Sequence, residues 1–243
     1  MTTPKNQTNK LGLTVGFAVE NWQGANLPND SILKGQYCTL EPLNIDKHSA
    51  DLFDAHKKDT KGKNWVYLPY GPFEKIEDYR SWMESSCFTG DPYFYAIVDN
   101  KSQKAIGVAS YLRITPAAGS IEVGHINYSP ALQSTIAATE AMYLMMENAF
   151  NLGYRRYEWK CNALNEKSCN AAKRLGFTYE GTFRQMMVVK GQNRDSAWFS
   201  CLDREWPAIQ SAFNQWLSPG NFDSEGKQKE ALSALAGAAL ASL

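Results

Sequence analysis

Apolar and polar positions repeat with two different periods along this chain. In the first third, Gln36–Leu43 alternates with the period of a strand, and the positions after Asp46 repeat with the period of a helix. Pro72 is favoured in the first turn of a helix, and the pattern behind it predicts a second helix to about Ser85. Regular structure is therefore expected to begin with one strand and two helices.

The middle of the chain carries three strand patterns and then the longest helical pattern. Tyr93–Val98, Ala105–Ile114 and Ser120–Tyr128 are rich in aromatic and β-branched residues, and the turns between them are short. Such turns favour an antiparallel meander. Over Thr135–Leu152 the apolar positions change to helical spacing, which predicts a helix.

The last part of the chain returns to strands. A strand is predicted at Tyr157–Asn162 and a helix at Asn165–Leu175. Two long strand patterns, Phe177–Lys190 and Arg194–Leu202, are joined by a turn-forming segment, which predicts a hairpin. A terminal helix is expected over Glu205–Leu217.

This order of elements predicts an α/β (α+β) fold, with a single mixed, mainly antiparallel sheet of about seven strands and helices on both faces. The helix Thr135–Leu152 lies between two strands and marks the expected parallel crossover. We expect an N-terminal extension over residues 1–33, one main domain over 34–205, and a C-terminal helix and tail over 206–243. For Ala231–Leu243, which is small and apolar, a frayed tail is favoured over a docked helix.

Composition narrows the class of protein. Lys plus Arg and Asp plus Glu each number 25, and this balance argues against a nucleic-acid binder driven by a basic surface. The five Cys and three His are dispersed, so neither a disulfide framework nor a metal site is expected. The first residues are polar and no run approaches about 18 apolar residues. We therefore expect no signal peptide, no membrane partner and a cytoplasmic location.

The stretch from Ser129 to Arg184 reads SPALQSTIAATEAMYLMMENAFNLGYRRYEWKCNALNEKSCNAAKRLGFTYEGTFR. It resembles the core of a GNAT acetyltransferase, and in particular the branch that includes the ribosomal-protein N-terminal acetyltransferases. The motifs that carry the likeness are ATEA at 138–141, Asn165 and Ser168 together with LGF at 175–177, and EG at 180–181 followed by Arg184. The likeness covers about residues 34–205, and it implies a GNAT fold and an N-acetyltransferase that uses acetyl-CoA.

The resemblance implies a place for the diphosphate of acetyl-CoA at the start of the Thr135–Leu152 helix. Helix starts offer free N–H groups and a positive dipole end, which suit an anion. The family has Gly where this chain has Ile136, whose side chain either blocks the phosphate or points into the core; we favour the second. Ser134 and Thr135 are expected to bind through hydroxyl groups or to cap the helix. The matching positions are Gln133, Ser134, Thr135, Ile136, Ala137 and Ala138.

The resemblance also implies residues that hold the pantetheine arm. In the family, the end of one strand splays from its neighbour and frees backbone groups for the cofactor amides. Ile126, Asn127 and Tyr128 match these positions, although an ordinary paired strand is the alternative. Asn165 resembles an Asn that contacts CoA and is also a good helix N-cap, and the two roles are compatible.

Acetyl transfer requires a neutral amine, a polarised carbonyl and protonation of the thiolate that leaves. Glu122 is the first candidate for the general base, and an ion pair with a neighbouring Arg or Lys is the alternative. Many GNAT enzymes carry a Tyr acid where this chain has Ala172. Ser168 is expected to donate the proton instead, unless it only caps the helix, and Tyr128 is the fallback.

Other polar residues near these positions are expected to be structural or to line the acceptor site. Strict alternation places Glu122 and Tyr128 on one face of their strand and His125 on the other, so His125 is expected to be a buried, satisfied side chain. Arg194 and Asp195 are predicted to form a structural ion pair or to act at the strand start, and contact with the substrate is less expected. The residues whose role as pocket wall or packing stays open are Trp65, Tyr67, Tyr70, Tyr179 and Arg184.

The leading hypothesis is an acetyl-CoA-dependent N-acetyltransferase. It would transfer acetyl to a primary amine of a small molecule or of a peptide or protein N-terminus, by direct attack in a ternary complex. The alternative is a non-catalytic GNAT-like module that binds CoA or a partner protein. An aminoacyl transferase that uses charged tRNA is disfavoured by the neutral net charge. No metal and no nucleic-acid partner are expected, and a homodimer is left open.

Overall fold

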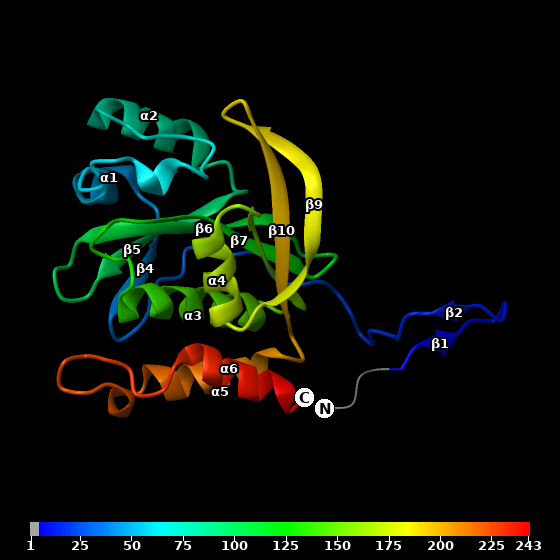
Figure 1. Cartoon of the computed structure of the whole chain (residues 1–243). Helices are drawn as coiled ribbons and strands as arrows, with labels where there is room; N and C mark the ends of the chain where they lie inside the picture. The colour runs from blue at the N-terminus through cyan, green and yellow to red at the C-terminus, as the bar shows by residue number, and fades with distance from the viewer. Residues whose placement is uncertain (1–4) are drawn as a thin grey trace.

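The computed structural model describes residues 5–243 and centres on an eight-stranded sheet (Figure 1). Neighbouring strands are antiparallel except β7 and β8, which are parallel. The mixed, mainly antiparallel sheet is thus confirmed, with one strand more than expected because a short strand pairs with the first predicted one. In sheet order the strands are β3 (Leu33–Lys34), β4 (Cys38–Pro42), β5 (Tyr93–Asp99), β6 (Ala105–Thr115), β7 (Ser120–Tyr128), β8 (Arg156–Asn162), β10 (Gln192–Leu202) and β9 (Thr178–Val189).

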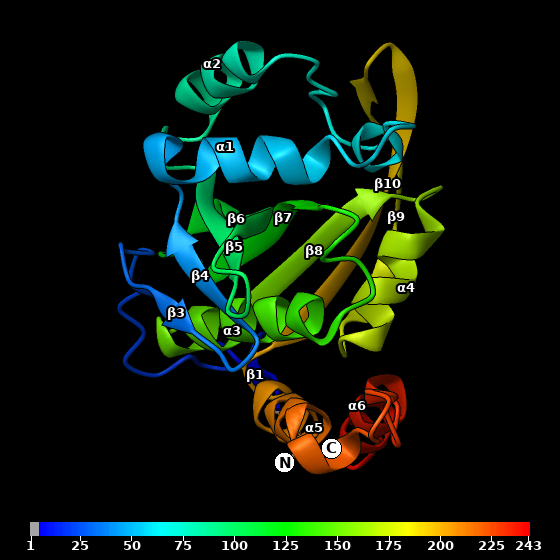
Figure 2. The ribbon, with the colours of Figure 1, turned by 90° about the vertical axis from the view of Figure 1, so that its left-hand side faces the viewer.

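Helices lie on both sides of this sheet, as predicted. Buried side chains of α1 and α2 form one apolar core, and those of α3, α4 and α5 share another. Figure 2 shows α1 and α2 at one end of the molecule and α5 and α6 at the other. The helices are α1 (Ile45–His56), α2 (Ile76–Ser86), α3 (Ile136–Asn151), α4 (Glu166–Arg174), α5 (Trp206–Leu217) and α6 (Leu232–Ala241).

A carboxylate on α3 fixes the helix to the turn between β3 and β4. Glu140 accepts hydrogen bonds from the backbone N–H groups of Gln36 at 2.7 Å, Tyr37 at 2.7 Å and Cys38 at 2.8 Å. At Gly35, a Cβ atom would lie 2.4 Å from this carboxylate, so the close approach requires glycine. A buried carboxylate is acceptable here because each N–H donor satisfies it.

One predicted helix start is wrong. α2 begins at Ile76 and not at Pro72, and Lys75 precedes it in an extended conformation. The intervening loop places Phe73 among the aromatic rings of Trp65 and Trp82, at centroid distances of 5.6 and 5.5 Å. Packing of this ring holds residues 72–75 out of the helix.

The prediction of a frayed C-terminal tail is also wrong. α6 packs against α5 and α4, and Leu232 is only 1% exposed. The loop before it is held by Asn221, which donates to the carbonyl of Trp216 at 3.0 Å and accepts from the amide of Glu230 at 2.9 Å. These contacts hold α6 against the protein, and they could not be predicted from the composition of this segment.

The N-terminal extension forms a small hairpin that projects from the body of the molecule (Figure 1). Its strands are β1 (Gln7–Thr8) and β2 (Thr14–Val15). Trp22 attaches the segment that follows, because its indole N–H donates to the carbonyl of Ala117 at 2.8 Å. In the described part of the chain, no helix combines the length and apolar character that a membrane crossing requires.

Candidate active site

The site lies where the two parallel strands of the sheet separate. β7 and β8 pair over only four residues, from Ser120 with Arg156 to Val123 with Trp159. Beyond Val123, β7 continues to Tyr128 without a strand on this side, so backbone groups that a sheet would occupy are exposed to a cleft. One of these groups is already used, because the carbonyl of Tyr128 accepts from the side-chain amides of Asn64 and Gln133, both at 2.9 Å.

A cavity of about 1510 Å³ extends from the start of α3, along β7, to β8 and β10. It joins the region of Thr135 to Glu122 without interruption. Ile136 lines this cavity and also packs against the core that α3 shares with the sheet. The cavity is lined by the expected base and by the expected cofactor positions except Ala137, which is buried against the core.

The start of α3 presents open backbone N–H groups to the cavity. Ser134 adopts a left-handed conformation with φ of 59°, and Thr135 then caps the helix by accepting from the amide of Ala138 at 3.2 Å. Within residues 5–243, the amides of Ser134, Ile136 and Ala137 have no hydrogen-bond acceptor. Such a helix start provides both N–H donors and a positive dipole end for an anion.

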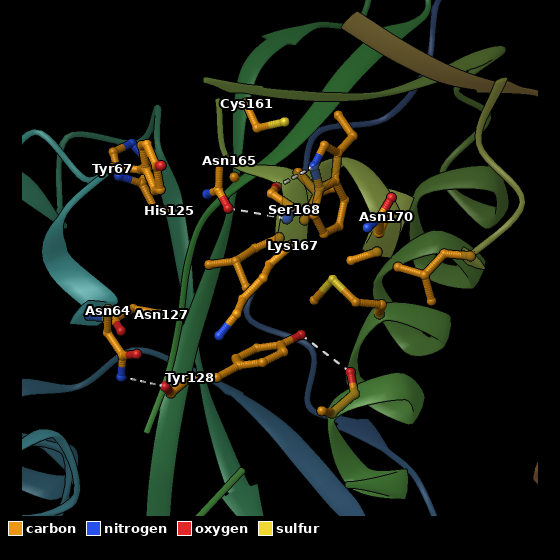
Figure 3. A pocket seen from close by; sticks show the side chains of 18 of the residues that line it. Asn64, Tyr67, His125, Asn127, Tyr128, Cys161, Asn165, Lys167, Ser168 and Asn170 are labelled. Atoms are coloured by element: carbon orange, nitrogen blue, oxygen red, sulfur yellow. Dashed lines mark hydrogen bonds between the residues drawn. The ribbon is translucent and has the colours of Figure 1, made fainter. Parts of the chain in front are cut away.

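Two predicted residues lie at the start of α4 on the opposite wall (Figure 3). The side chain of Asn165 caps α4 by accepting from the amide of Ser168 at 3.2 Å. The hydroxyl oxygen of Ser168 accepts from the indole N–H of Trp159 at 3.0 Å. The hydroxyl also lies beside the thiol of Cys161, and Ser168 lines the cavity.

Glu122 is buried on β7 with two cations beside it. Its Oε2 lies 2.8 Å from Nη1 of Arg113 and 2.8 Å from Nζ of Lys160. Its other oxygen, Oε1, has no hydrogen-bond partner in the described residues. Burial raises the pKa of this carboxyl, whereas Lys160 and Arg113 act in the opposite direction. The expected ion pair is therefore present, and it leaves one carboxylate oxygen of this cavity-lining residue without a partner within residues 5–243.

A β-bulge corrects the predicted alternation along β7. Gly124 pairs with Ser110 and Asn127 with Val108, so His125 and Ile126 both stand opposite one residue of β6. His125 has a φ of 49°, and its ring stacks on Tyr70 at a centroid distance of 5.6 Å. The extra residue reverses the facing of the strand end, because side chains alternate with a period of two.

This bulge changes what His125 and Tyr128 can do. Burial, with smaller contributions from Arg113 and Arg194, lowers the pKa of His125 to about 4, so the imidazole is neutral near pH 7. Tyr128 points to α3, where its hydroxyl donates to the carbonyl of Ala138 at 3.2 Å. Burial raises the pKa of Tyr128, and its proton is already engaged. The fallback role of Tyr128 as proton donor would therefore require its hydrogen bond to Ala138 to break.

The sequence analysis missed two basic residues of α4. Lys167 and Arg174 both line the cavity, and Figure 3 shows the Lys167 side chain extending between α4 and Tyr128. The guanidinium of Arg174 donates to the hydroxyl of Thr139 at 3.0 Å. Their spacing of seven residues, which places two side chains on the same face of a helix, was the signal that could have identified them.

Comparison with known proteins decides the family. Residues 38–178 match the model of the acetyltransferase (GNAT) domain. The chain belongs to the GNAT acetyltransferase family. Its structure is similar to that of a GCN5-related N-acetyltransferase from Brucella melitensis, with 44% identity, coverage of 90% of this chain and 100% of that one, and a TM-score of 0.88.

Two further structures extend this result. A protein of the GNAT family from Chromobacterium violaceum is 41% identical, with coverage of 79% and 96% of the two chains and a TM-score of 0.74. RimL, an acetyltransferase of ribosomal protein L7/L12, is 19% identical over 74% and 99% of the chains, with a TM-score of 0.59, and shares the fold. No curated protein sequence matches the chain. The chain is thus an N-acetyltransferase with relatives of the same family.

The cavity of this GNAT enzyme fits acetyl-CoA, the cosubstrate of the family. Asn127 Oδ1 is buried, lines the cavity and has no partner in the described residues, so it can accept from a pantetheine amide. The open amides at α3 and the cations of α4 suit the phosphates. Among residues 5–243, no cluster of three or more His, Cys, Asp and Glu has metal-binding geometry.

At the other end of the cavity lies the space for the acceptor, which we call the acceptor end: the region around Glu122 between β6, β7 and β10. Tyr67 lines the cavity, whereas Trp65 is buried in the core of α1 and α2 and Tyr70 stacks on His125. The exposed β9 residues Tyr179 and Arg184 do not line it.

The predicted ion pair between Arg194 and Asp195 is wrong. Asp195 accepts from the backbone N–H of Gln185 at 2.8 Å and from the side chain of Asn193 at 3.0 Å. A register irregularity between β9 and β10 lies next to these residues, and Gln185 has a φ of 50°. The carboxylate of Asp195 stabilises this irregularity, while Arg194 lines the cavity of the GNAT enzyme.

Proposed function

We propose that this GNAT enzyme transfers the acetyl group of acetyl-CoA to a primary amine of a small molecule or of a peptide or protein N-terminus, by direct attack in a ternary complex. The single observation that carries this proposal is the continuous cavity between the open amides of α3 and the free oxygen of Glu122. A ternary complex requires space for both substrates at once, which a cavity of about 1510 Å³ supplies.

Binding of the cofactor is assigned to residues at one end of the cavity. In this proposal, the amides of Ile136 and Ala137 receive the diphosphate, and Lys167 and Arg174 add positive charge. Gln133, which donates to the carbonyl of Tyr128, shapes the turn before α3. When bound, acetyl-CoA supplies the acetyl group as an activated thioester.

Proton transfer is assigned to two residues on opposite walls. Glu122 accepts a proton from the attacking amine through Oε1, directly or through a water, because a protonated ammonium has no lone pair for attack. Ser168 gives its hydroxyl proton to the thiolate that leaves, and the indole of Trp159 holds its oxygen in place. The new C–N bond forms as the C–S bond breaks.

The test is a thiol-release assay with acetyl-CoA and a panel of amines and N-terminal peptides, combined with titration calorimetry of acetyl-CoA. Binding together with release of CoA for at least one amine supports the proposal. Binding of acetyl-CoA with no acetylated product across the panel would instead favour a non-catalytic CoA-binding module. Absence of binding at millimolar acetyl-CoA would exclude both.

A further inference from the structure

The cavity concentrates positive charge in a chain whose net charge is zero. Six basic and two acidic side chains line it. Lys167 and Arg174 belong to the end assigned to the cofactor phosphates. Arg113, Lys160 and Arg194 instead line the acceptor end, where Glu122 is the one carboxylate among the lining residues that the structure describes. The acceptor end therefore carries more positive than negative charge, and this excess is not explained by acetyl-CoA.

Of the three cations at the acceptor end, Arg194 is the one without a counter-ion among the described residues. Its guanidinium makes one hydrogen bond, from Nε to the hydroxyl of Ser196 at 3.2 Å, and no carboxylate of residues 5–243 lies within 4.0 Å of it. By contrast, Lys160 lies 2.8 Å from Glu122 and 2.7 Å from Glu158. Burial lowers the pKa of Arg194, as expected for a cation held partly out of water. Partly buried cations usually have a partner, so a ligand is the natural candidate.

The backbone is built to hold two arginines at the acceptor end. Arg113 has a φ of 48° and is the extra residue of a bulge in β6, and Arg194 borders the irregularity between β9 and β10. An aspartate stabilises each distortion: Asp91 accepts from the amide of Arg113 at 2.9 Å, as Asp195 does from Gln185. Bulges next to active sites change the direction of side chains. Asp91 and Asp195 accept hydrogen bonds from backbone N–H groups, and neither is paired with a guanidinium group in the described part of the chain.

We propose that the acceptor amine carries an oxyanion, a carboxylate or a phosphate, which Arg194 binds with help from Arg113 while the amine meets Glu122. This inference rests on the proposed acetyl transfer. The planar fork of an arginine matches carboxylate and phosphate oxygens with two parallel hydrogen bonds. Nearby cations also lower the pKa of a bound ammonium and so favour the neutral amine that attacks. Amines without an anionic group, such as polyamines, are repelled.

The binding test uses probes without an amine, so that it does not depend on catalysis. Phenylacetate, phenyl phosphate and the neutral phenylacetamide are titrated into the CoA-loaded protein by calorimetry. We expect at least one anion to bind ten-fold or more tightly than phenylacetamide, and Arg194→Gln to weaken that anion about 10- to 100-fold. The anion that binds more tightly shows whether the anionic group of the acceptor is a carboxylate or a phosphate.

The matched control is Arg184→Gln, which removes an exposed arginine of the neighbouring strand outside the cavity. It is expected to leave all three affinities unchanged, and unchanged affinity for acetyl-CoA shows that each variant is folded. Equal binding of the anions and phenylacetamide to the wild-type protein overturns the proposal, whatever the variants do. Equal losses in Arg194→Gln and Arg184→Gln overturn it as well.

A kinetic arm separates this inference from the proposed function. Phenylalanine and phenylalaninamide, which differ in the carboxylate, are compared as acceptors. A higher kcat/KM for phenylalanine that Arg194→Gln abolishes supports the anion site. If anions bind but no amine is acetylated, the anion site is supported and the proposed acetyl transfer is refuted. If acetyl is transferred with equal kcat/KM to both acceptors, only the anion site is refuted.

Discussion

Glu122 shows how a buried carboxylate can be both paired and reactive. Two cations hold Oε2 at 2.8 Å each, and they offset part of the effect of burial on the pKa. The second oxygen has no hydrogen-bond partner among the described residues, and Glu122 lines the cavity. The proton affinity of such a base is higher than that of an exposed carboxylate, because burial outweighs the two cations.

Replacing Glu122 with Gln is expected to lower kcat/KM by about 10²–10⁴-fold and to remove the acidic limb of the pH–rate profile. Arg113→Gln should keep that limb but move it to higher pH, because the cation that lowers the pKa of Glu122 is lost. The two profiles are measured with saturating acetyl-CoA. An acidic limb that persists unchanged in Glu122→Gln would assign it to another group.

A histidine in the α1–α2 core predicts how stability depends on pH. Burial lowers the pKa of His56 to about 4, and its ring packs on Trp65 at 5.2 Å. The unfolded chain has the ordinary value near 6.5, so the stability is complete above about pH 6.5 and is lost as pH falls toward 4. His125 acts in the same direction.

We therefore expect His56→Phe to reduce the loss of unfolding free energy between pH 7.5 and 4.5 by about 2 kcal/mol. Urea unfolding at the two pH values measures it. If wild type and variant lose the same amount, the protonation of His56 is not coupled to folding.

At this scale, sequence prediction worked where a role depends on local position. Asn165 was expected to cap its helix, and it does. Arg113 and Arg194 could not be placed at the acceptor end, because their direction depends on bulges that arise from pairing between strands. A single extra residue at His125 likewise reversed the alternation that was used for Tyr128.

At the scale of elements, α3 is the helix on which the site is built. It presents amides to the cavity at its start, and one turn later Glu140 fixes it to the β3–β4 turn through three backbone N–H donors. The cofactor positions and this anchor are therefore separated by only a few residues of one rigid helix. A change in the anchor should be transmitted to the helix start.

Glu140→Gln is expected to lower the unfolding free energy by about 3 kcal/mol, because the amide presents its own donors to buried N–H groups and the charged acceptor is lost. Glu147→Gln on the same helix is the control, since Glu147 accepts only from side chains of Tyr143 and Gln210 and should change stability by less than about 1 kcal/mol. Denaturant unfolding distinguishes them. Similar changes in unfolding free energy in both variants would show that Glu140 does not anchor α3.

The periodicity of hydrophobic residues predicted the order and type of the main elements. It did not predict where α2 begins or that α6 is docked. Residues 72–75 stay outside α2 because Phe73 packs among aromatic rings from other segments. α6 was missed because its Ala-rich sequence has no distinct apolar face, and what stabilises it is contact with α5 and α4. Both errors come from tertiary contacts that override local propensity.

At the scale of the whole molecule, the C-terminal segment belongs to the structure around the site. Phe222 and Gln228, in the loop between α5 and α6, line the same cavity as Arg174 of α4. Trp216 donates to Gln228 at 2.8 Å and fixes this loop. Part of the cavity wall thus comes from a segment that lies beyond residues 38–178, the part matched by the family model.

Leu232→Ala is expected to lower the unfolding free energy by about 3 kcal/mol, because Leu232 is 1% exposed and its removal leaves a cavity. Ser233→Ala, one residue on and exposed, should change it by less than about 0.5 kcal/mol. A Leu232→Ala variant as stable as the wild type would show that α6 does not dock in solution.

A crystal structure with acetyl-CoA tests most directly whether the cavity is the place of acetyl transfer. We expect diphosphate oxygens within hydrogen-bond distance of the amides of Ile136 and Ala137, and the thioester between Ser168 and Glu122. Density for the nucleotide at another surface, with the start of α3 free of phosphate, would contradict the assignment of the cavity to acetyl-CoA.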